Sequence, residues 1–320
     1  MVNSKVVTWE YPLLDGSRQN LVKRVGDGSI ITRFERTPIP SKSTDVVCPH
    51  FLELKWANGC PFDCAWCYLK GTLRFRPEKA KPRIKDFAKI EQHVRSFIDN
   101  SNGHAELLNT GELSDSLMYE RNGNPFSKFI LSLFESQDRN KVLFLTKSKN
   151  VQHLLENDYK KNAIVSFSIN AHCVANKFEK RAPAVEERIQ AASELAKAGY
   201  EVRIRIDPMV PVRNWEQKYR DAVDDIFSQF IPSRITLGSL RGLQSTINNA
   251  ADKSWVAYLS ENSNWGKRIE ANIRFLMYRE VIDYLKETHN YTNVALCKET
   301  LEIWDKLGMD YRSIKCNCVL

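Results

Sequence analysis

Three cysteines near residue 60 are spaced like the ligands of a metal cluster. Cys60, Cys64 and Cys67 are separated by three and then two residues. Thiolates at this spacing on one loop can each bind one iron of a [4Fe–4S] cluster, which leaves the fourth iron open to another ligand. A structural zinc site normally has four protein ligands in paired spacings. The spacing therefore favours an iron–sulfur cluster, with zinc as the alternative.

A second set of cysteines lies late in the sequence. Cys316 and Cys318 are one residue apart, and Cys297 follows a predicted strand. These three thiols could form a second site that binds an auxiliary iron–sulfur cluster, or they could supply a hydrogen atom or sulfur to a reaction. A tail with free thiols, or a disulfide between Cys316 and Cys318, is the alternative. Cys48 and Cys173 are interpreted as ordinary small packing residues.

The sequence has no apolar run long enough to span a bilayer, so no membrane partner is expected. Its first residues lack the apolar stretch of a secretory signal, and we therefore expect a cytoplasmic location. In that compartment, clustered cysteines favour metal binding or catalysis over disulfides.

The formal net charge is +8, and the densest basic cluster, residues 70–85, directly follows the cysteine loop. A basic excess favours anionic partners, so nucleic acid is a candidate. A solvated basic surface is the alternative, because net charge alone is weak evidence.

Strand-like runs alternate with helix-like runs after residue 47, which predicts an α/β protein with a parallel sheet built from βαβ units. The predicted strands are residues 51–56, 105–109, 141–145, 164–169, 202–206, 234–237 and 293–296. Predicted helices include residues 87–99, 126–135, 185–198 and 272–286. Six to seven such units suggest a barrel or part of one. We predict an N-terminal extension over 1–47, the barrel over 48–290 and a C-terminal extension over 291–320.

Polar residues follow or line the predicted strands. Glu112 comes after the second strand and Lys147 after the third, while Ser168 and Asn170 share one face of the fourth. Arg205 lies on the fifth, where it alternates with apolar residues. Each strand alone could be an ordinary exposed face. Together they predict a site, because the chemistry of a barrel gathers at the carboxyl ends of its strands.

The cysteine loop, with Trp66 directly before its third cysteine, resembles that of the radical S-adenosylmethionine superfamily. In that superfamily S-adenosylmethionine chelates the open iron, and electron transfer from the cluster gives a 5′-deoxyadenosyl radical that abstracts a hydrogen atom. The resemblance implies S-adenosylmethionine as cofactor, a position for Trp66 near its adenine, and an electron donor such as flavodoxin or ferredoxin. The cofactor then performs the difficult step, and the protein supplies orientation and excludes water.

A closer resemblance, over roughly residues 50–300, is to the spore photoproduct lyase family. The shared segments are Cys67-Tyr68-Leu69, Ser114-Asp115, Thr146-Lys147 and residues 167–170, 186–192 and 197–200. The resemblance implies that family's partial (β/α)6 TIM-type barrel. It implies S-adenosylmethionine contacts at Ser114, Lys147 and Ser168, and a contact from Glu112 to the methionine amino group. The full candidate cofactor-binding set is Trp66, Glu112, Ser114, Lys147, Ser168, Asn170 and Arg205. The candidate catalytic residues are Cys60, Cys64, Cys67, Tyr68, Cys316 and Cys318.

Glu112 is also a departure from the family pattern. In the lyases, a cysteine two residues before the Ser-Asp pair returns a hydrogen atom to the substrate radical, and here that position is Glu112. A carboxyl O–H bond is too strong to donate a hydrogen atom as a thiol does. Either another thiol serves, or the substrate differs, since function follows the site rather than the fold.

The favoured interpretation is a radical S-adenosylmethionine enzyme that abstracts hydrogen from an organic substrate, with a nucleic-acid base as one candidate. A second interpretation keeps this chemistry and changes the target to a peptide, a nucleoside or a small metabolite. A third is a zinc-stabilised nucleic-acid-binding protein without catalysis. The third does not explain the polar strand ends.

Overall fold

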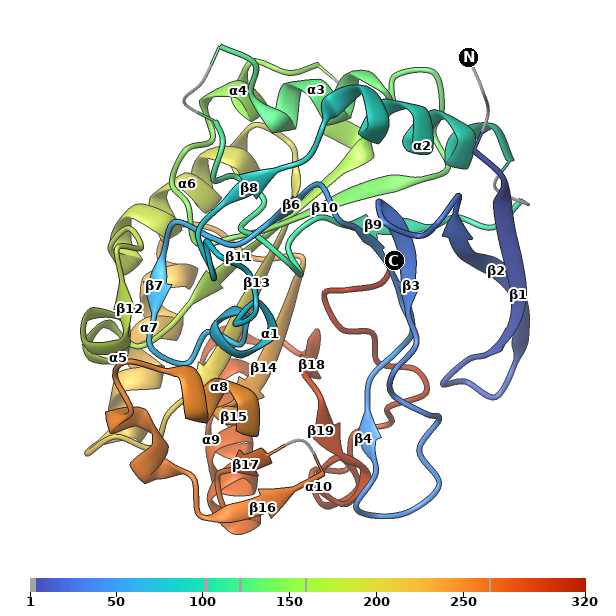
Figure 1. Cartoon of the computed structure of the whole chain (residues 1–320). Helices are drawn as coiled ribbons and strands as arrows, with labels where there is room; N and C mark the ends of the chain where they lie inside the picture. The colour runs from blue at the N-terminus through green and yellow to red at the C-terminus, as the bar shows by residue number, and fades with distance from the viewer. Residues whose placement is uncertain (1–3, 101–102, 121–122, 159, 265) are drawn as a thin grey trace.

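A parallel sheet forms the centre of the computed structural model, which describes residues 4–100, 103–120, 123–158, 160–264 and 266–320. Its parallel strands stand in the order β5, β9, β10, β11, β13, β14 and β18 (Figure 1). Their bounds are Phe51–Leu54, Leu107–Asn109, Lys141–Thr146, Ala163–Ile169, Glu201–Met209, Arg234–Ser239 and Val294–Leu296. Each overlaps one predicted strand, so the α/β prediction is confirmed. The sheet ends at β18 instead of closing on itself, as expected for a partial barrel.

Three antiparallel strands extend the other edge of this sheet. They are β1 (Val6–Pro12), β2 (Arg18–Val25) and β3 (Ile31–Phe34), and β3 pairs with β5. Figure 1 shows them in dark blue, beside the barrel. They occupy most of the segment predicted only as an extension, of which residues 1–3 lie outside the described part of the chain.

Helices cover the outer face of the sheet (Figure 1). Among them are the longer helices α2 (Phe87–Asn100), α3 (Phe126–Ser132), α6 (Val185–Lys197), α7 (Trp215–Phe227) and α9 (Ala271–His289). Shorter helices elsewhere are α1 (Leu69–Thr72), α4 (Gln152–Leu155), α5 (His172–Phe178), α8 (Gln244–Asn249) and α10 (Leu301–Lys306). The four predicted helices correspond to α2, α3, α6 and α9. The Glu187 carboxylate caps the start of helix α6 by accepting a hydrogen bond from the Ala184 N–H at 2.9 Å. It is followed by Gly199 at φ +93°, a backbone conformation that glycine adopts without strain. Within the described residues, no helix combines the length and apolar character needed to cross a bilayer.

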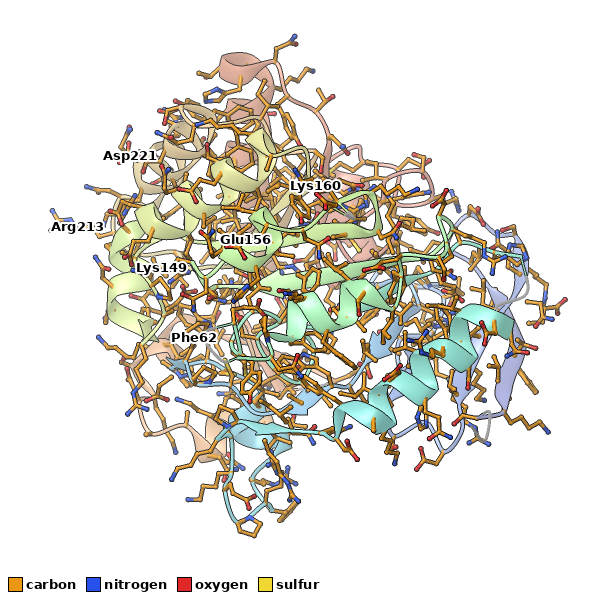
Figure 2. All side chains as sticks on the ribbon, turned by 90° about the horizontal axis from the view of Figure 1, so that it is seen from above. Phe62, Lys149, Glu156, Lys160, Arg213 and Asp221 are labelled. Atoms are coloured by element: carbon orange, nitrogen blue, oxygen red, sulfur yellow. The ribbon has the colours of Figure 1, made fainter. Side chains whose placement is uncertain are left out.

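Short strand pairs tie loops to the barrel. The pairs are β4 (Val46–Val47) with β19 (Glu299–Thr300), β6 (Ala57–Asn58) with β8 (Arg83–Ile84), and β7 (Asp63–Cys64) with β12 (Glu179–Lys180). A small sheet of β15 (Arg241–Leu243), β17 (Gly266–Arg268) and β16 (Glu261–Ser263) completes the structure, together with the 3-10 turns η1 (Lys160–Asn162) and η2 (Ser254–Tyr258). Seen from above, the interior is filled with side chains, while labelled polar residues such as Lys149, Arg213 and Asp221 lie on the outside (Figure 2).

The C-terminal tail, residues 314–320, lies inside the partial barrel rather than on its surface. Asn317 is fully buried and donates through Nδ2 to the Ser166 hydroxyl at 2.9 Å and to the Ile204 carbonyl at 2.8 Å. Leu320 packs against Leu107, Leu143 and other buried residues of the parallel strands. Figure 1 shows this tail in dark red, between β18 and β3. It fills part of the space that the open sheet leaves.

Candidate active site

The loop that carries Cys60, Cys64 and Cys67 is held by hydrogen bonds from distant parts of the chain. β7, which contains Cys64, pairs with β12, more than a hundred residues later in the sequence. The Ala65 N–H donates to the Phe178 carbonyl at 2.7 Å, and the Cys60 N–H donates to the Ala80 carbonyl at 2.9 Å. The three cysteines therefore follow β5 on a loop with a fixed backbone. We call this segment, residues 59–67, the cluster loop.

Gly59 begins the cluster loop in a conformation that requires glycine. Its φ is +88°, and a Cβ atom there would lie 2.2 Å from the Lys81 carbonyl oxygen. Backbone atoms cannot move aside as a flexible side chain can. Only glycine therefore allows residues 80–81 to approach the loop this closely.

The three loop thiols are shielded from water. Burial raises the pKa of the Cys60 and Cys67 thiols, and it raises that of Cys64 to about 12 despite the opposing charge of Lys147. Such thiols stay protonated until a metal displaces the proton. A set of three free thiols on one braced loop fits a cubane iron–sulfur cluster with one open iron.

A buried ionic network stands behind the cluster loop and joins two predicted residues. Lys147 Nζ lies 3.8 Å from a Glu179 carboxylate oxygen, and Arg188 donates to the other oxygen at 2.5 Å. The same guanidinium donates to the Ser168 carbonyl at 3.1 Å. Burial alone would lower the pKa of Lys147, but the Glu179 carboxylate and the Cys64 sulfur outweigh it and raise the pKa. The ends of β10 and β11 and the cluster loop are thus held together around one buried carboxylate, that of Glu179.

The Ser114-Asp115 pair lies between the ends of β9 and β10. Asp115 accepts hydrogen bonds at 2.7 Å from the Thr146 hydroxyl and from the Lys147 N–H. The Ser114 hydroxyl donates to the Thr110 carbonyl at 3.4 Å, and the residue is 5% exposed. Asp115 therefore fixes the backbone from which Lys147 projects.

Two other predicted cofactor ligands lie in well-packed surroundings. Trp66 is buried, and its ring is 5.1 Å from that of Phe178. Asn170 is fully buried, donates to the Pro208 carbonyl at 2.8 Å and accepts from the Tyr219 hydroxyl at 3.2 Å. Their contacts with S-adenosylmethionine stay predictions.

Tyr68 connects the end of the cluster loop to the segment that follows the neighbouring strand β9. Its hydroxyl donates to the backbone carbonyl of Glu112, and the Glu112 carboxylate accepts from Asn109 Nδ2 at 3.1 Å. The same Asn109 amide lies 4.0 Å from the Cys318 sulfur. The predicted residues Tyr68, Glu112 and Cys318 are therefore brought to one side of the interior.

Four thiols gather on that side: Cys48, Cys297, Cys316 and Cys318, which we call the tail-thiol cluster. Cys48 and Cys318 pack together, with Cys316 against them. A hydrogen bond from Cys318 to Cys316 lowers the pKa of the Cys316 thiol and raises that of Cys318. Burial raises the pKa of Cys297 to about 11. All eight cysteines of the chain are free.

Two arginines face the tail-thiol cluster. Arg205 Nη2 donates to the Cys318 sulfur at 3.0 Å, and Arg241 Nη2 donates to the Cys297 sulfur at 3.4 Å. Both lie near Asp207, with nitrogen–oxygen distances of 4.0 Å for Arg205 and 3.1 Å for Arg241. Burial would raise the pKa of Asp207, but the two guanidinium groups outweigh it and lower the pKa.

Comparison with known proteins agrees with this geometry. The family model for spore photoproduct lyase matches residues 51–239, which is more than half of the chain. The chain belongs to the spore photoproduct lyase family. The resemblance to this family that the sequence indicates is therefore confirmed.

Curated relatives in the family are distant. The spore photoproduct lyase of Geobacillus sp. (strain Y412MC61) is 27% identical over 176 residues, which cover 54% of this chain and 50% of the relative. That of Bacillus subtilis (strain 168) is 28% identical over 170 residues, covering 52% and 48%. The chain thus spans about half the length of the curated relatives it matches.

Solved structures share the fold. Spore photoproduct lyase complexed with dinucleoside spore photoproduct superimposes with a TM-score of 0.65 at 18% identity, over 82% of this chain and 78% of that one. Streptococcus suis SuiB bound to precursor peptide SuiA gives a TM-score of 0.53 at 16% identity, over 79% of this chain and 49% of that one. These likenesses support the partial TIM-type barrel.

The sequence alone assigns no role to Glu179 or Arg188, although Arg188 lies in a segment shared with the family, and Cys48 is interpreted from it as a packing residue. Glu179 and Arg188 form the buried pair behind Lys147, with side chains 1% exposed. Cys48 precedes β5 and has no cysteine neighbour in sequence. Only the pairing of β4 with β19 brings its segment beside Cys297.

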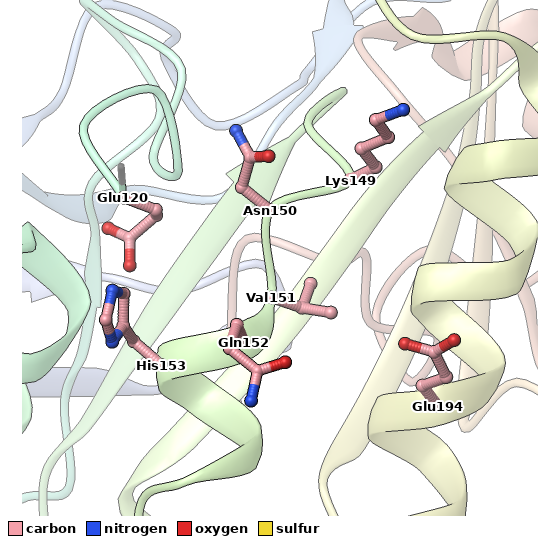
Figure 3. Close-up of a pocket in the computed structure, with 7 residues that line it drawn as sticks. All are labelled: Glu120, Lys149, Asn150, Val151, Gln152, His153 and Glu194. Atoms are coloured by element: carbon pink, nitrogen blue, oxygen red, sulfur yellow. The ribbon is translucent and has the colours of Figure 1, made fainter. Parts of the chain in front are cut away.

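A surface hollow of about 260 Å³ lies outside the barrel beside α4, away from the cluster loop (Figure 3). Glu120 and His153 point toward one another within it, whereas Lys149 points away. Lys149 is ion-paired with Glu187, and Glu120 accepts a hydrogen bond from the Ser127 hydroxyl. These partners leave the hollow's charged groups engaged within the protein, so we place the chemistry at the buried site instead.

Proposed function

We propose that this enzyme holds a [4Fe–4S] cluster on Cys60, Cys64 and Cys67, binds S-adenosylmethionine beside it and acts on a nucleic-acid base. When bound, the cluster and S-adenosylmethionine supply reductive cleavage to a 5′-deoxyadenosyl radical, which abstracts a hydrogen atom from the substrate. The observation that carries the proposal is the braced loop of three free thiols at the strand ends, beside the buried cation of Lys147. An external one-electron donor of the flavodoxin or ferredoxin class completes the scheme.

The chain's own residues have separable roles in this proposal. Lys147 offers a positive charge to a carboxylate, and its ion pair with Glu179 fixes its position. Ser114 follows β9 and Ser168 lies on β11, on either side of β10; both are buried and suited to ribose or amino-acid groups. Glu112 offers a carboxylate to the methionine ammonium. The low exposure of Cys64 and Trp66 excludes water from the reacting atoms.

A nucleic-acid substrate is supported by the segment that follows the cluster loop. Phe75 is 83% exposed, and the Arg74 guanidinium lies 4.1 Å from the centre of its ring. Residues 70–85 around them are rich in lysine and arginine. An exposed aromatic ring within a basic segment is a platform on which a base can stack while the phosphates bind nearby. A solved structure with the same fold is a spore photoproduct lyase complexed with dinucleoside spore photoproduct.

The radical chemistry is tested by anaerobic reconstitution with iron, sulfide, dithionite and S-adenosylmethionine. We expect the wild type and a Cys173→Ala control, which removes an exposed thiol, to form 5′-deoxyadenosine. The Cys60→Ala variant should form none. Equal amounts of 5′-deoxyadenosine from wild type and Cys60→Ala would contradict the proposed cluster site.

The substrate class is tested by binding to single-stranded DNA at several salt concentrations. We expect affinity to fall steeply with salt, because phosphate contacts release counterions. Phe75→Ala should weaken binding about tenfold, since one stacked base contributes about 1–3 kcal/mol. Trp9→Ala is the matched control, because Trp9 is 60% exposed beneath Lys23 at 5.0 Å, outside the basic segment. Equal affinities of the two variants would point to a peptide, nucleoside or small-metabolite substrate instead.

A further inference from the structure

The tail-thiol cluster unites cysteines that are far apart in the sequence. Cys48 precedes β5, Cys297 follows β18, and Cys316 and Cys318 come from the C-terminal tail. Asn317 anchors the tail pair by hydrogen bonds to β11, β13 and β14. Four thiols inside one barrel, from three separate segments, are a sufficient ligand set for a metal cluster.

Two buried guanidinium groups face these thiols, and the Asp207 and Glu112 carboxylates act on the one at Arg205. Arg205 and Arg241 bring two positive charges, and Asp207 brings one negative charge. Arg205 is 9% exposed, and within the described part of the chain its buried Nε–H has no hydrogen-bond partner. A buried donor without a partner is costly, so a further acceptor is expected near the Arg205 guanidinium. They point at the sulfurs of Cys318 and Cys297, at 3.0 and 3.4 Å.

All four thiols lie on backbone outside the helices and the long strands. Among the described residues, no three cysteine, histidine, aspartate or glutamate side chains stand where they could already hold a single metal ion. The same holds for the three thiols of the cluster loop. Loop and turn positions allow the tail-thiol cluster to close around an inorganic core as it binds, which couples metal binding to local ordering.

We propose that the tail-thiol cluster binds a second, auxiliary [4Fe–4S] cluster through Cys48, Cys297, Cys316 and Cys318. A cubane with four thiolate ligands has no open iron, so this site would not bind S-adenosylmethionine. Arg205 and Arg241 donate N–H groups to two of the ligand sulfurs, and these hydrogen bonds stabilise the negative charge of the cluster. Zinc fits less well, because structural zinc sites take their ligands in paired CxxC-like spacings. The site does not depend on the cluster loop.

Iron and sulfide counting after anaerobic reconstitution tests the inference. We expect the wild type and the exposed-thiol control Cys173→Ser to hold about eight irons per chain, as two [4Fe–4S] clusters require. A Cys60→Ala/Cys64→Ala/Cys67→Ala variant should keep about four irons, and a Cys316→Ser/Cys318→Ser variant should also keep about four. The two half-loaded proteins should give different electron paramagnetic resonance spectra when reduced.

The two proposals fail in distinguishable ways. About four irons in the wild type and none in the loop variant would overturn the auxiliary site and leave the cluster loop intact. If the tail variant held no iron and the loop variant held as much iron as the wild type, the cluster-loop site would be overturned and the auxiliary site would stand. Zinc instead of iron in the loop variant also overturns the inference. Circular dichroism checks the folding of each variant. If the tail variant unfolds, Cys48→Ser replaces it, and an unchanged spectrum and iron count in that variant would refute the site.

Discussion

Replacing Asn317 with alanine should release the C-terminal tail from the barrel. The Asn317 amide accepts from the Thr236 hydroxyl at 2.8 Å and donates to Ser166 and Ile204 at 2.9 and 2.8 Å. The residue is fully buried, so no water replaces these partners in the folded state. Asn317→Ala removes all three side-chain hydrogen bonds at once.

The expected cost follows from these contacts. Each hydrogen bond contributes about 1 kcal/mol net, and a buried group left without a partner costs about 1–3 kcal/mol. The Ser166 hydroxyl and the Ile204 carbonyl lose this partner, whereas Thr236 still accepts from the Asn317 N–H at 3.0 Å. Together these effects destabilise the docked tail by roughly 3–5 kcal/mol. A local segment can open at that cost without global unfolding.

Thiol reactivity distinguishes local release from global unfolding. In metal-free wild type, Cys173 should react quickly with a thiol reagent, because it is the exposed cysteine, while Cys318 is 7% exposed. In Asn317→Ala, Cys316 and Cys318 should also react quickly, and urea denaturation should report the loss of stability. Asn249→Ala is the control, because that exposed amide donates only to the Ser245 carbonyl. An unchanged labelling rate with a stability loss below about 1 kcal/mol would refute the docked tail.

Three further predictions concern the cluster loop and its surroundings. Gly59→Ala should abolish iron loading of the cluster loop in an iron assay, because its Cβ would clash with backbone atoms. Gly199→Ala is the control: its φ is +93° but the space around it is open, so it should cost only about 1 kcal/mol of stability and load iron normally. Lys147→Met should weaken S-adenosylmethionine binding at least about tenfold, which corresponds to about 1.4 kcal/mol, as measured by calorimetry. Lys149→Met, which changes an exposed lysine, should leave the affinity unchanged. Burial lowers the pKa of Lys85 to about 8 from 10.5, so between these values the unfolded chain binds a proton that the folded chain lacks. The free energy of unfolding of the wild type should therefore rise with pH across that range, by roughly 1 kcal/mol relative to Lys85→Met after allowance for partial exposure. Urea denaturation at several pH values measures it, and an identical pH dependence in the two proteins would contradict the prediction.

The parallel strands and the cluster loop could be predicted from sequence because their signals are local. Runs such as residues 163–169 are buried along their whole length, so their apolar character is continuous. The spacing of Cys60, Cys64 and Cys67 is likewise contained in eight residues. Both signals depend only on neighbours along the chain.

The path of the tail could not be predicted, because its signal is not local. Asn317 is one polar residue in a short segment without periodicity, and its three partners lie on three different strands. Cys48 becomes a neighbour of Cys318 only after the tail has docked. The antiparallel strands β1 to β3 could not be predicted either. The burial pattern of β1, for example, does not alternate, and Tyr11 is its one buried residue. Sequence periodicity fails for elements whose order depends on distant partners.

The pairing of β7 with β12 has a consequence for the order in which the protein matures. The loop that carries Cys64 gains its shape only when a strand more than a hundred residues later has folded beside it. A nascent chain that stops before residue 179 therefore presents three thiols without the framework that spaces them. Contacts of such long sequence separation form late in folding. Under the proposed function, a cluster on this loop would therefore be inserted after β12 has folded beside β7, because the emerging loop lacks its framework until then.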